Sequence, residues 1–301
     1  MHTKTIFLAG AGGHTGAHII PLLHEQGYTI RLLTRNTAQM LARQPRLCSM
    51  SNLHIIEGDA TNPNSLKNAC DGADAVISTL GASLDLYDFS DRRSFHDIDF
   101  TANCNLLHEA KRSAVQKFVY LSAFGAEKVK TPYMSEHEAF AQKLAASGLD
   151  YSIIQPTGFF YVNAEFVAMA KRGRAMIIGD GSARTNPIHE ADVAKACVDG
   201  LSSNEKRVNI GGAETFTRKE VTELAFAALG KKARISAVPF GMIKFGSQIT
   251  RPFNRRLGEL VEFGAIVATQ DCVAPAVSTE HRLLAYFREV ATSLKNLELS
   301  A

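Results

Sequence analysis

Residues 5–16 read Thr5-Ile6-Phe7-Leu8-Ala9-Gly10-Ala11-Gly12-Gly13-His14-Thr15-Gly16. A five-residue strand-like run precedes glycines spaced GxxGxxG, at Gly10, Gly13 and Gly16, and a helical pattern follows at once. In such a strand–turn–helix unit the first glycine permits a tight turn and the second lets backbone approach a pyrophosphate. The third lets the helix pack closely on the strand. The stretch therefore predicts a dinucleotide-binding turn, against the alternative of a purely structural glycine turn.

The N–H groups at the start of a helix attract anions, so we assign the cofactor-binding role to the whole turn. Its members are Gly10, Gly12, Gly13, His14, Thr15 and Gly16.

The residue after the second predicted strand indicates which dinucleotide is held. NAD binders commonly end that strand with an acid that accepts a bond from the ribose 2′-OH. Here the strand ends Leu33-Thr34-Arg35, and the Arg35 guanidinium suits a 2′-phosphate. We therefore predict NADP(H), with Arg43 as a weaker second cation and a merely solvated Arg35 as the alternative.

Two further positions are candidates for the cofactor site. Asp59, after the third predicted strand, could accept a bond from the adenine amino group, or could serve only a turn or helix cap. Gly81, after the fourth, permits close backbone approach to the dinucleotide, or marks an ordinary turn.

The pattern along the chain predicts the fold class. Short apolar runs at residues 5–9, 29–33, 53–56, 75–79, 118–122 and 151–154 alternate with helical patterns at 15–24, 37–43, 65–69, 101–113 and 137–146. Apolar strands alternating with amphipathic helices predict an α/β protein with a doubly wound parallel sheet, the Rossmann fold. We assign residues 1–155 to this NADP-binding domain. Residues 156–301 form a smaller, mixed C-terminal region that covers the substrate and packs closely on the domain. Within it, Thr217-Arg218-Lys219-Glu220 predicts a capping box.

Composition excludes several classes of partner. A net charge of +3 with no run of Lys and Arg argues against nucleic acid. No apolar run approaches the length of a membrane span, so we expect no membrane partner. Five cysteines without metal spacing or a secretory signal predict reduced thiols, no metal site and a cytoplasmic location. An oligomer is compatible with the sequence, which does not indicate its order.

Several motifs in order make the sequence resemble the atypical short-chain dehydrogenase/reductases of the NmrA-like group. They are the glycine turn, residues 31–36, Gly58-Asp59, residues 99–103 (Asp-Phe-Thr-Ala-Asn), 118–122 (Phe-Val-Tyr-Leu-Ser), 147–151, 156–160 and 186–192. The resemblance implies NADPH-dependent reduction of quinones, enones or flavins, or NADP binding by a regulator without turnover.

The resemblance also implies an active site, from which this chain departs. The group's serine matches Ser122, and the tyrosine of its Tyr-x-x-x-Lys matches Tyr133, but His137 stands where the lysine belongs. An ordinary histidine is mostly neutral at pH 7, so Tyr133 would be a weaker acid. We assign Ser122, Tyr133 and His137 as catalytic candidates, with a cap or turn for Ser122 and apolar packing for Tyr133 as alternatives. Gln155 replaces the group's usual arginine before Pro156.

The sequence leaves three possible functions to compare. We expect an NADPH-dependent oxidoreductase that reduces a small carbonyl, enone or quinone substrate. The alternative is an NADP(H)-sensing regulatory protein with little or no turnover, which the missing lysine favours. A sugar-nucleotide epimerase or dehydratase is disfavoured, because it needs a well-activated tyrosine base.

Overall fold

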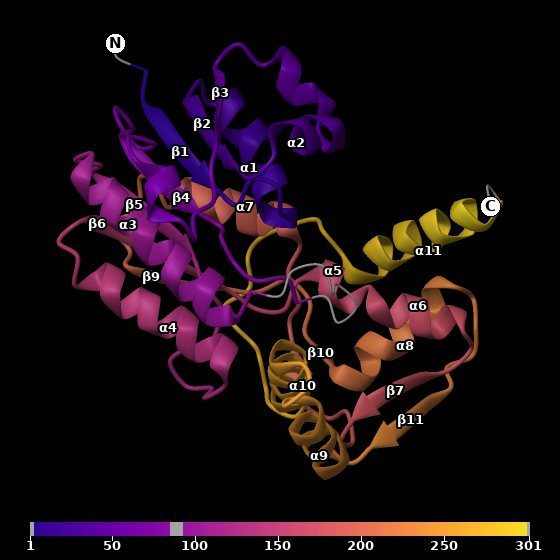
Figure 1. The fold of residues 1–301 in the computed structure, drawn as a ribbon. Helices are drawn as coiled ribbons and strands as arrows, with labels where there is room; N and C mark the ends of the chain where they lie inside the picture. The colour runs from indigo at the N-terminus through magenta and orange to yellow at the C-terminus, as the bar shows by residue number, and fades with distance from the viewer. Residues whose placement is uncertain (1–2, 85–92, 300–301) are drawn as a thin grey trace. The chain divides into compact units, whose positions relative to one another are not determined.

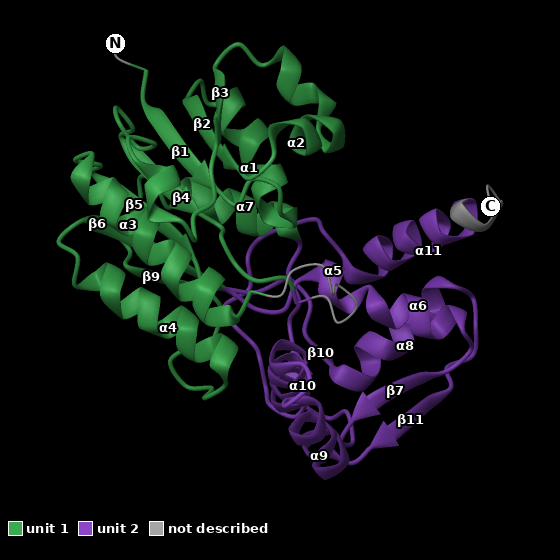
Figure 2. Ribbon diagram, viewed as in Figure 1, with its two compact units in different colours: residues 1–83, 93–155, 190–208 green, residues 84–92, 156–189, 209–301 purple. Residues whose placement is uncertain are grey.

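The computed structural model describes residues 3–84 and 93–299. Its first compact unit contains residues 1–83, 93–155 and 190–208, and its second contains 84–92, 156–189 and 209–301 (Figure 2). The sequence-based division at residue 155 coincides with the end of one segment of the first unit. Residues 190–208, which that division gave to the second region, return to the first unit.

The predicted parallel sheet is confirmed, and it has seven strands in the order β3-β2-β1-β4-β5-β6-β9 (Figure 1). The strands are β1 (Thr5–Ala9), β2 (Thr29–Thr34), β3 (Leu53–Glu57), β4 (Ala75–Ser78), β5 (Lys117–Leu121), β6 (Asp150–Pro156) and β9 (Arg207–Ile210). Strand order reverses between β1 and β4, and parallel sheets of this kind bind ligands at the carboxyl ends of the strands beside such a switch.

Helices cover both faces of this sheet, as its apolar strands require. On one face lie α3 (Asn103–Arg112) and α4 (Pro132–Ala145), whose apolar side chains pack on Phe7, Phe118 and Tyr120. Helices α1 (His14–Glu25) and α7 (Glu190–Asp199) pack together on the other (Figure 1). The remaining elements of this unit are α2 (Thr37–Arg43), η1 (Pro45–Ser49), η2 (Pro63–Leu66) and the π-helical turn η3 (His96–Ala102).

Two expected helices differ from their predictions. Residues 65–69 do not form an α-helix, because the chain at Pro63 takes the short 3₁₀ turn η2 instead. Helix α4 begins five residues earlier than predicted, since Pro132 suits the first helical position and the Thr131 hydroxyl accepts a bond from the Met134 N–H at 3.3 Å.

The second unit combines short strands with helices. Strands β7 (Ala175–Ile178) and β11 (Ile235–Val238) pair in parallel, and β8 (Arg184–Thr185) pairs antiparallel with β10 (Phe216–Thr217). Its helices are α5 (Phe160–Asn163), α6 (Glu165–Lys171), α8 (Arg218–Ala228), α9 (Phe240–Thr250), α10 (Arg255–Ala268) and α11 (Leu283–Leu299). The predicted capping box is confirmed at the start of α8. No helix in residues 3–84 and 93–299 is long and apolar enough to cross a membrane.

Candidate functional site

The glycine turn lies between β1 and α1. At two of its positions, the surrounding protein leaves no room for any residue other than glycine. Gly10 has a φ of +87°, and a Cβ there would lie 2.5 Å from Thr79 Oγ1 on the neighbouring chain segment. A Cβ on Gly16 would lie 2.3 Å from the Gly10 carbonyl oxygen. The first glycine therefore permits the turn and the third permits the close contact of helix and strand, as the spacing predicts.

The middle glycine has a different environment. A Cβ on Gly13 would meet only the Gly10 carbonyl oxygen, at 3.4 Å, and Gly12 and Gly13 are exposed. Helix α1 begins at His14 with no side-chain cap and no acid in its first turn. The first N–H groups of α1 therefore lie next to exposed glycines. This arrangement fits a pyrophosphate.

Charged side chains gather where β2 and β3 end. Arg35 is exposed just beyond β2, and its charge acts on the Asp59 carboxyl. Glu57, opposite Thr34 in the strand register, accepts a bond from the Thr37 N–H at 3.0 Å and so caps α2. The neighbouring acid is therefore engaged by backbone, and Arg35 is the cation at this strand end.

Asp59 makes a turn of its own. Its Oδ1 accepts bonds from the Thr61 N–H at 2.9 Å and the Thr61 hydroxyl at 2.8 Å, and Arg93 lies 3.3 Å from Oδ2. Burial raises the pKa of Asp59, but the bonds from Thr61 and the charges of Arg93 and Arg35 outweigh it and lower the pKa overall. Asp59 therefore has the turn role that the sequence left open, and its contact with adenine stays a prediction.

The segment after β4 is held by two buried residues, Asp99 and Asn103, which were named from the sequence only within a motif of the resemblance and were given no role. The Ala82 N–H lies 3.3 and 3.4 Å from the Asp99 oxygens, and a Cβ on Gly81 would approach Asp99 Oδ1 to 3.4 Å. The Asn103 amide donates to the carbonyl oxygens of Leu80 and Asp99, at 3.3 and 2.9 Å. The backbone beside Gly81 is thus fixed to η3 and α3, and its approach to the dinucleotide stays a prediction.

His137 is the clearest departure from the sequence-based picture of the site. It lies one turn into α4, is 3% exposed, and its Nδ1 lies 2.6 Å from the hydroxyl of the fully buried Tyr120 on β5. Its Nε2 is 3.2 Å from Asp99 Oδ1, outside hydrogen-bonding geometry. Both ring nitrogens therefore face protein groups.

Burial determines the protonation state of Tyr120 in the trio of Tyr120, His137 and Asp99. Desolvation and the charge of Asp99 raise the pKa of Tyr120 well above its usual range, so the phenol stays protonated. The phenol and the His137 Nδ1 share this hydrogen bond, and Nε2 faces the Asp99 carboxylate. Such a histidine does not present a fixed positive charge as a lysine would.

Tyr133 and Ser122 differ in the contacts that their side chains make with neighbouring residues. The Tyr133 ring packs edge-on against His137 and Phe95, with centroids 4.6 and 5.3 Å away. The packing role that the sequence left open is therefore present. Ser122 follows β5, and its buried Oγ has no hydrogen-bond partner among the described residues. A buried hydroxyl without a partner is a place where a polar ligand atom fits.

Gln155 occupies the position of the resembling group's arginine. It is buried, and its Nε2 lies 3.4 Å from the Ala123 carbonyl oxygen, next to Ser122. The residue thus supports the segment after β5 as a neutral group.

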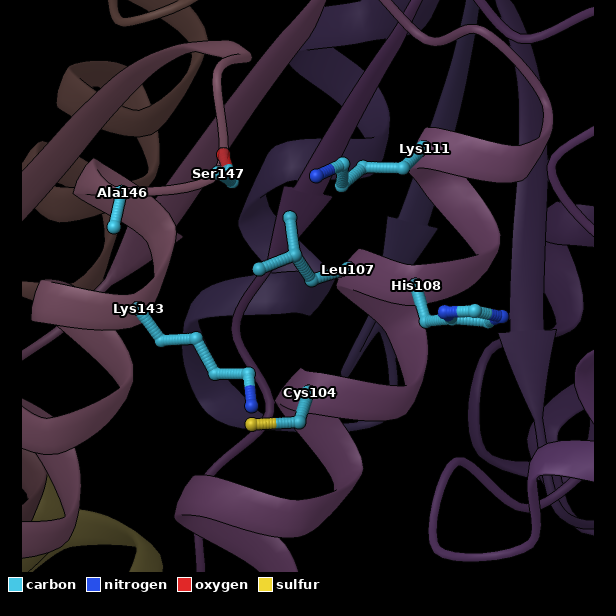
Figure 3. Close-up of a pocket in the computed structure, with 7 residues that line it drawn as sticks. All are labelled: Cys104, Leu107, His108, Lys111, Lys143, Ala146 and Ser147. Carbon is cyan, nitrogen blue, oxygen red and sulfur yellow. The ribbon is translucent and has the colours of Figure 1, made fainter.

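A separate hollow of about 300 Å³ opens between α3 and α4 (Figure 3). None of the predicted cofactor or catalytic residues lines it. Its lining residues are Cys104, Leu107, His108, Lys111, Lys143, Ala146 and Ser147.

A family model described as NAD(P)H-binding matches residues 10–204, which include the glycine turn, β2 and the Ser122–His137 segment. The chain belongs to this NAD(P)H-binding family. The resemblance to atypical short-chain dehydrogenase/reductases is thereby confirmed.

Relatives in this family carry diverse names. The chain is 26% identical over 255 residues to the photosystem II assembly factor Ycf39 of Synechocystis, covering 82% of this chain and 74% of that protein. It is 23% identical over 250 residues to an Arabidopsis thaliana subunit of mitochondrial NADH dehydrogenase, covering 80% and 61%.

Solved structures share the fold. A nucleoside-diphosphate-sugar epimerase from Staphylococcus aureus matches with a TM-score of 0.72 at 17% identity, over 95% of this chain and all of that one. The Escherichia coli NADPH-dependent quinone oxidoreductase QOR2 matches with a TM-score of 0.68 at 17% identity, over 97% and 99%.

Proposed function

We propose that this protein is an NADPH-dependent oxidoreductase whose substrate is a small quinone, enone or carbonyl, with quinone-like acceptors preferred. The observation that carries the proposal is the burial of His137 between Tyr120 and Asp99, in a chain that also has the dinucleotide-type glycine turn. The chain keeps the glycine turn suited to a cofactor but has a histidine, His137, where the group's lysine would follow Tyr133 by four residues.

The proposed cofactor contacts follow from the geometry. The N–H groups at the start of α1 would hold the pyrophosphate, and Arg35 would hold the 2′-phosphate. When bound, NADPH supplies a hydride. Ser122, with its unpartnered buried hydroxyl, would donate a bond to a polar atom of the nicotinamide or the substrate.

The preference for quinones rests on proton supply. A histidine does not carry the fixed charge of a lysine, so we expect Tyr133 to be a weaker acid than the tyrosine of the resembling group, and a poor one for reducing a simple ketone. A quinone or enone accepts hydride to give a stabilised anion, which takes its proton from water. Such substrates do not need an activated tyrosine.

Purified protein tested with NADPH and a panel of quinones, enones and aldehydes should oxidise NADPH fastest with the quinones. Rapid turnover of aldehydes alone, abolished in Tyr133→Phe, would contradict the preference and show that Tyr133 is an effective acid.

The 2′-phosphate assignment has its own test. Arg35→Glu removes a charge-assisted contact and adds repulsion, so NADPH should bind about 100-fold or more weakly while NADH binding changes little. Arg46→Glu is the matched control, because it makes the same charge change at an exposed site on η1. Equal losses for both cofactors in Arg35→Glu would refute the assignment.

A second function is favoured by the same buried histidine. Because His137 stands where the group's lysine belongs, the second candidate is a regulator that holds NADP(H) without turnover, and relatives such as Ycf39 are named assembly factors. Tight NADPH binding without turnover across the whole panel would favour this function over the reductase.

A further inference from the structure

The helical pair α9–α10 in the second unit presents large apolar side chains to solvent. Residues on one face of α9, spaced i, i+3 and i+7, are strongly exposed, and so is a phenylalanine in the turn that follows. They are Met242 at 65%, Phe245 at 65%, Ile249 at 54% and Phe253 at 88%. Scattered exposed apolar residues are ordinary, but four within twelve residues form a patch.

The packing of α9 and the turn after it accounts for this exposure. The opposite side of α9 packs on α10, where a Cβ on Gly258 would lie 2.9 Å from the Cα of Arg251. The turn is fixed as well, because the Phe253 N–H donates to the Thr250 carbonyl oxygen at 3.0 Å and the Asn254 side chain caps α10. The contact with α10 therefore leaves the apolar face outward and holds Phe253 in the turn beside it.

The charge around the face is one-sided. Residues 240–258 contain four Lys and Arg and no Asp or Glu. Within residues 240–262 the cations are Lys244, Arg251, Arg255 and Arg256, against Glu259 and Glu262, which gives +4 − 2 = +2. Arg251 and Arg255 pair with Glu259, at 3.3 and 2.8 Å, while Lys244 is exposed on α9 itself.

We propose that α9 and the turn at Phe253 dock the protein on the surface of an anionic lipid bilayer. The apolar face enters the boundary between headgroups and acyl chains, and the surrounding cations, Lys244 foremost, meet the lipid phosphates. Phe and Met on one side of a helix, with Lys and Arg beside them and no acid on the helix, are the features of an interfacial helix. The sequence-based expectation of no membrane partner rested on the absence of a spanning run, which a helix lying in the interface does not need.

The proposal is independent of the proposed reaction and is tested on the full chain. Protein is sedimented with vesicles of phosphatidylcholine alone, or of phosphatidylcholine mixed with phosphatidylglycerol. We expect binding to the anionic vesicles, weakened by salt, and little binding to the neutral ones. Absence of binding to anionic vesicles would overturn the proposal, and equal binding to both kinds would overturn the assignment of the cations to lipid phosphates.

Variants locate the surface. The double variant Phe245→Ser, Phe253→Ser should lose about tenfold or more in vesicle affinity, because it removes two apolar side chains from the buried face. Its thermal unfolding should match that of the wild type, since both residues are exposed. Lys244→Glu should lose several-fold in affinity. Lys232→Glu makes the same charge change at an exposed site three residues before β11, away from α9 in the sequence, and should bind as the wild type does.

Other occupants of the face give different results. If the wild type self-associates, the double variant is monomeric and neither binds vesicles, the face is a contact between copies of this chain and the membrane proposal is wrong. Undiminished vesicle binding by the double variant would also overturn it.

Discussion

The hydrogen bond between Tyr120 and His137 gives a prediction with two independent parts. Tyr120→Phe removes one buried hydroxyl and keeps the ring, which packs edge-on against Phe140 at 4.6 Å. It leaves the His137 Nδ1, formerly 2.6 Å from that hydroxyl, buried without its partner. An unsatisfied buried polar group costs about 1–3 kcal/mol, so we expect the free energy of unfolding at neutral pH to fall by about that amount.

The second part concerns alkaline pH. Burial, then the charge of Asp99, raises the pKa of Tyr120 well above 10.0 in the folded protein. Above pH 10 the unfolded chain loses this proton while the folded chain keeps it, so stability falls as pH rises, by about 1.4 kcal/mol per unit. Below pH 10 the contribution is fully present. Tyr120→Phe lacks it, so the stability difference between wild type and variant should shrink by about 1.4 kcal/mol between neutral pH and about pH 11.

Urea unfolding of both proteins at the two pH values measures these quantities, and groups common to both cancel in the difference. Tyr151→Phe, at a half-buried position on β6, is the matched control and should change stability by less than about 0.5 kcal/mol. Equal stability of wild type and Tyr120→Phe at neutral pH would refute the buried hydrogen bond. A difference that does not change at alkaline pH would refute the raised pKa.

Two further predictions test the turn and an ion pair. Gly16→Ala should lose about 1–3 kcal/mol or more in urea unfolding, because its Cβ would lie 2.3 Å from the Gly10 carbonyl oxygen, whereas Gly12→Ala, with 3.8 Å to the nearest atom, should be tolerated. Arg207→Leu should destabilise the protein at pH 7, because it leaves the mostly buried Glu138 carboxylate without its bonds of 2.8 and 2.9 Å. The Arg207 bonds lower the Glu138 pKa, so this stabilisation is present above pH 4.5 and is lost on acidification. The difference from wild type should therefore narrow in unfolding experiments below pH 4.5, and a constant difference would contradict the assigned cause.

Local patterns predicted the strands well and their partners less well. Runs such as β1 and β4 are apolar because both sheet faces are covered, and this can be read within five residues. The short run Val208-Asn209-Ile210 suits a strand, yet nothing local indicates that β9 pairs at the sheet edge beside β6. That partner is chosen by packing between segments about fifty residues apart, and the same packing returns residues 190–208 to the first unit.

In the candidate site, too, some residues follow from local sequence and others depend on long-range packing. The structural roles of Gly10 and Gly16 and the proposed role of Arg35 depend on backbone geometry or on position at a strand end, so short stretches of sequence predict them. The trio of Tyr120, His137 and Asp99 joins three separate elements, and a comparison with the lysine position alone gives His137 no partner. One local signal could have supplied it. Side chains alternate along a strand, so Tyr120 shares a sheet face with Ser122, the face that the helix carrying His137 covers. A phenol buried on that face needs a partner, and the imidazole in the lysine position can accept its hydrogen. Strand alternation combined with polar satisfaction would therefore have predicted a histidine turned inward, away from the role of a lysine substitute.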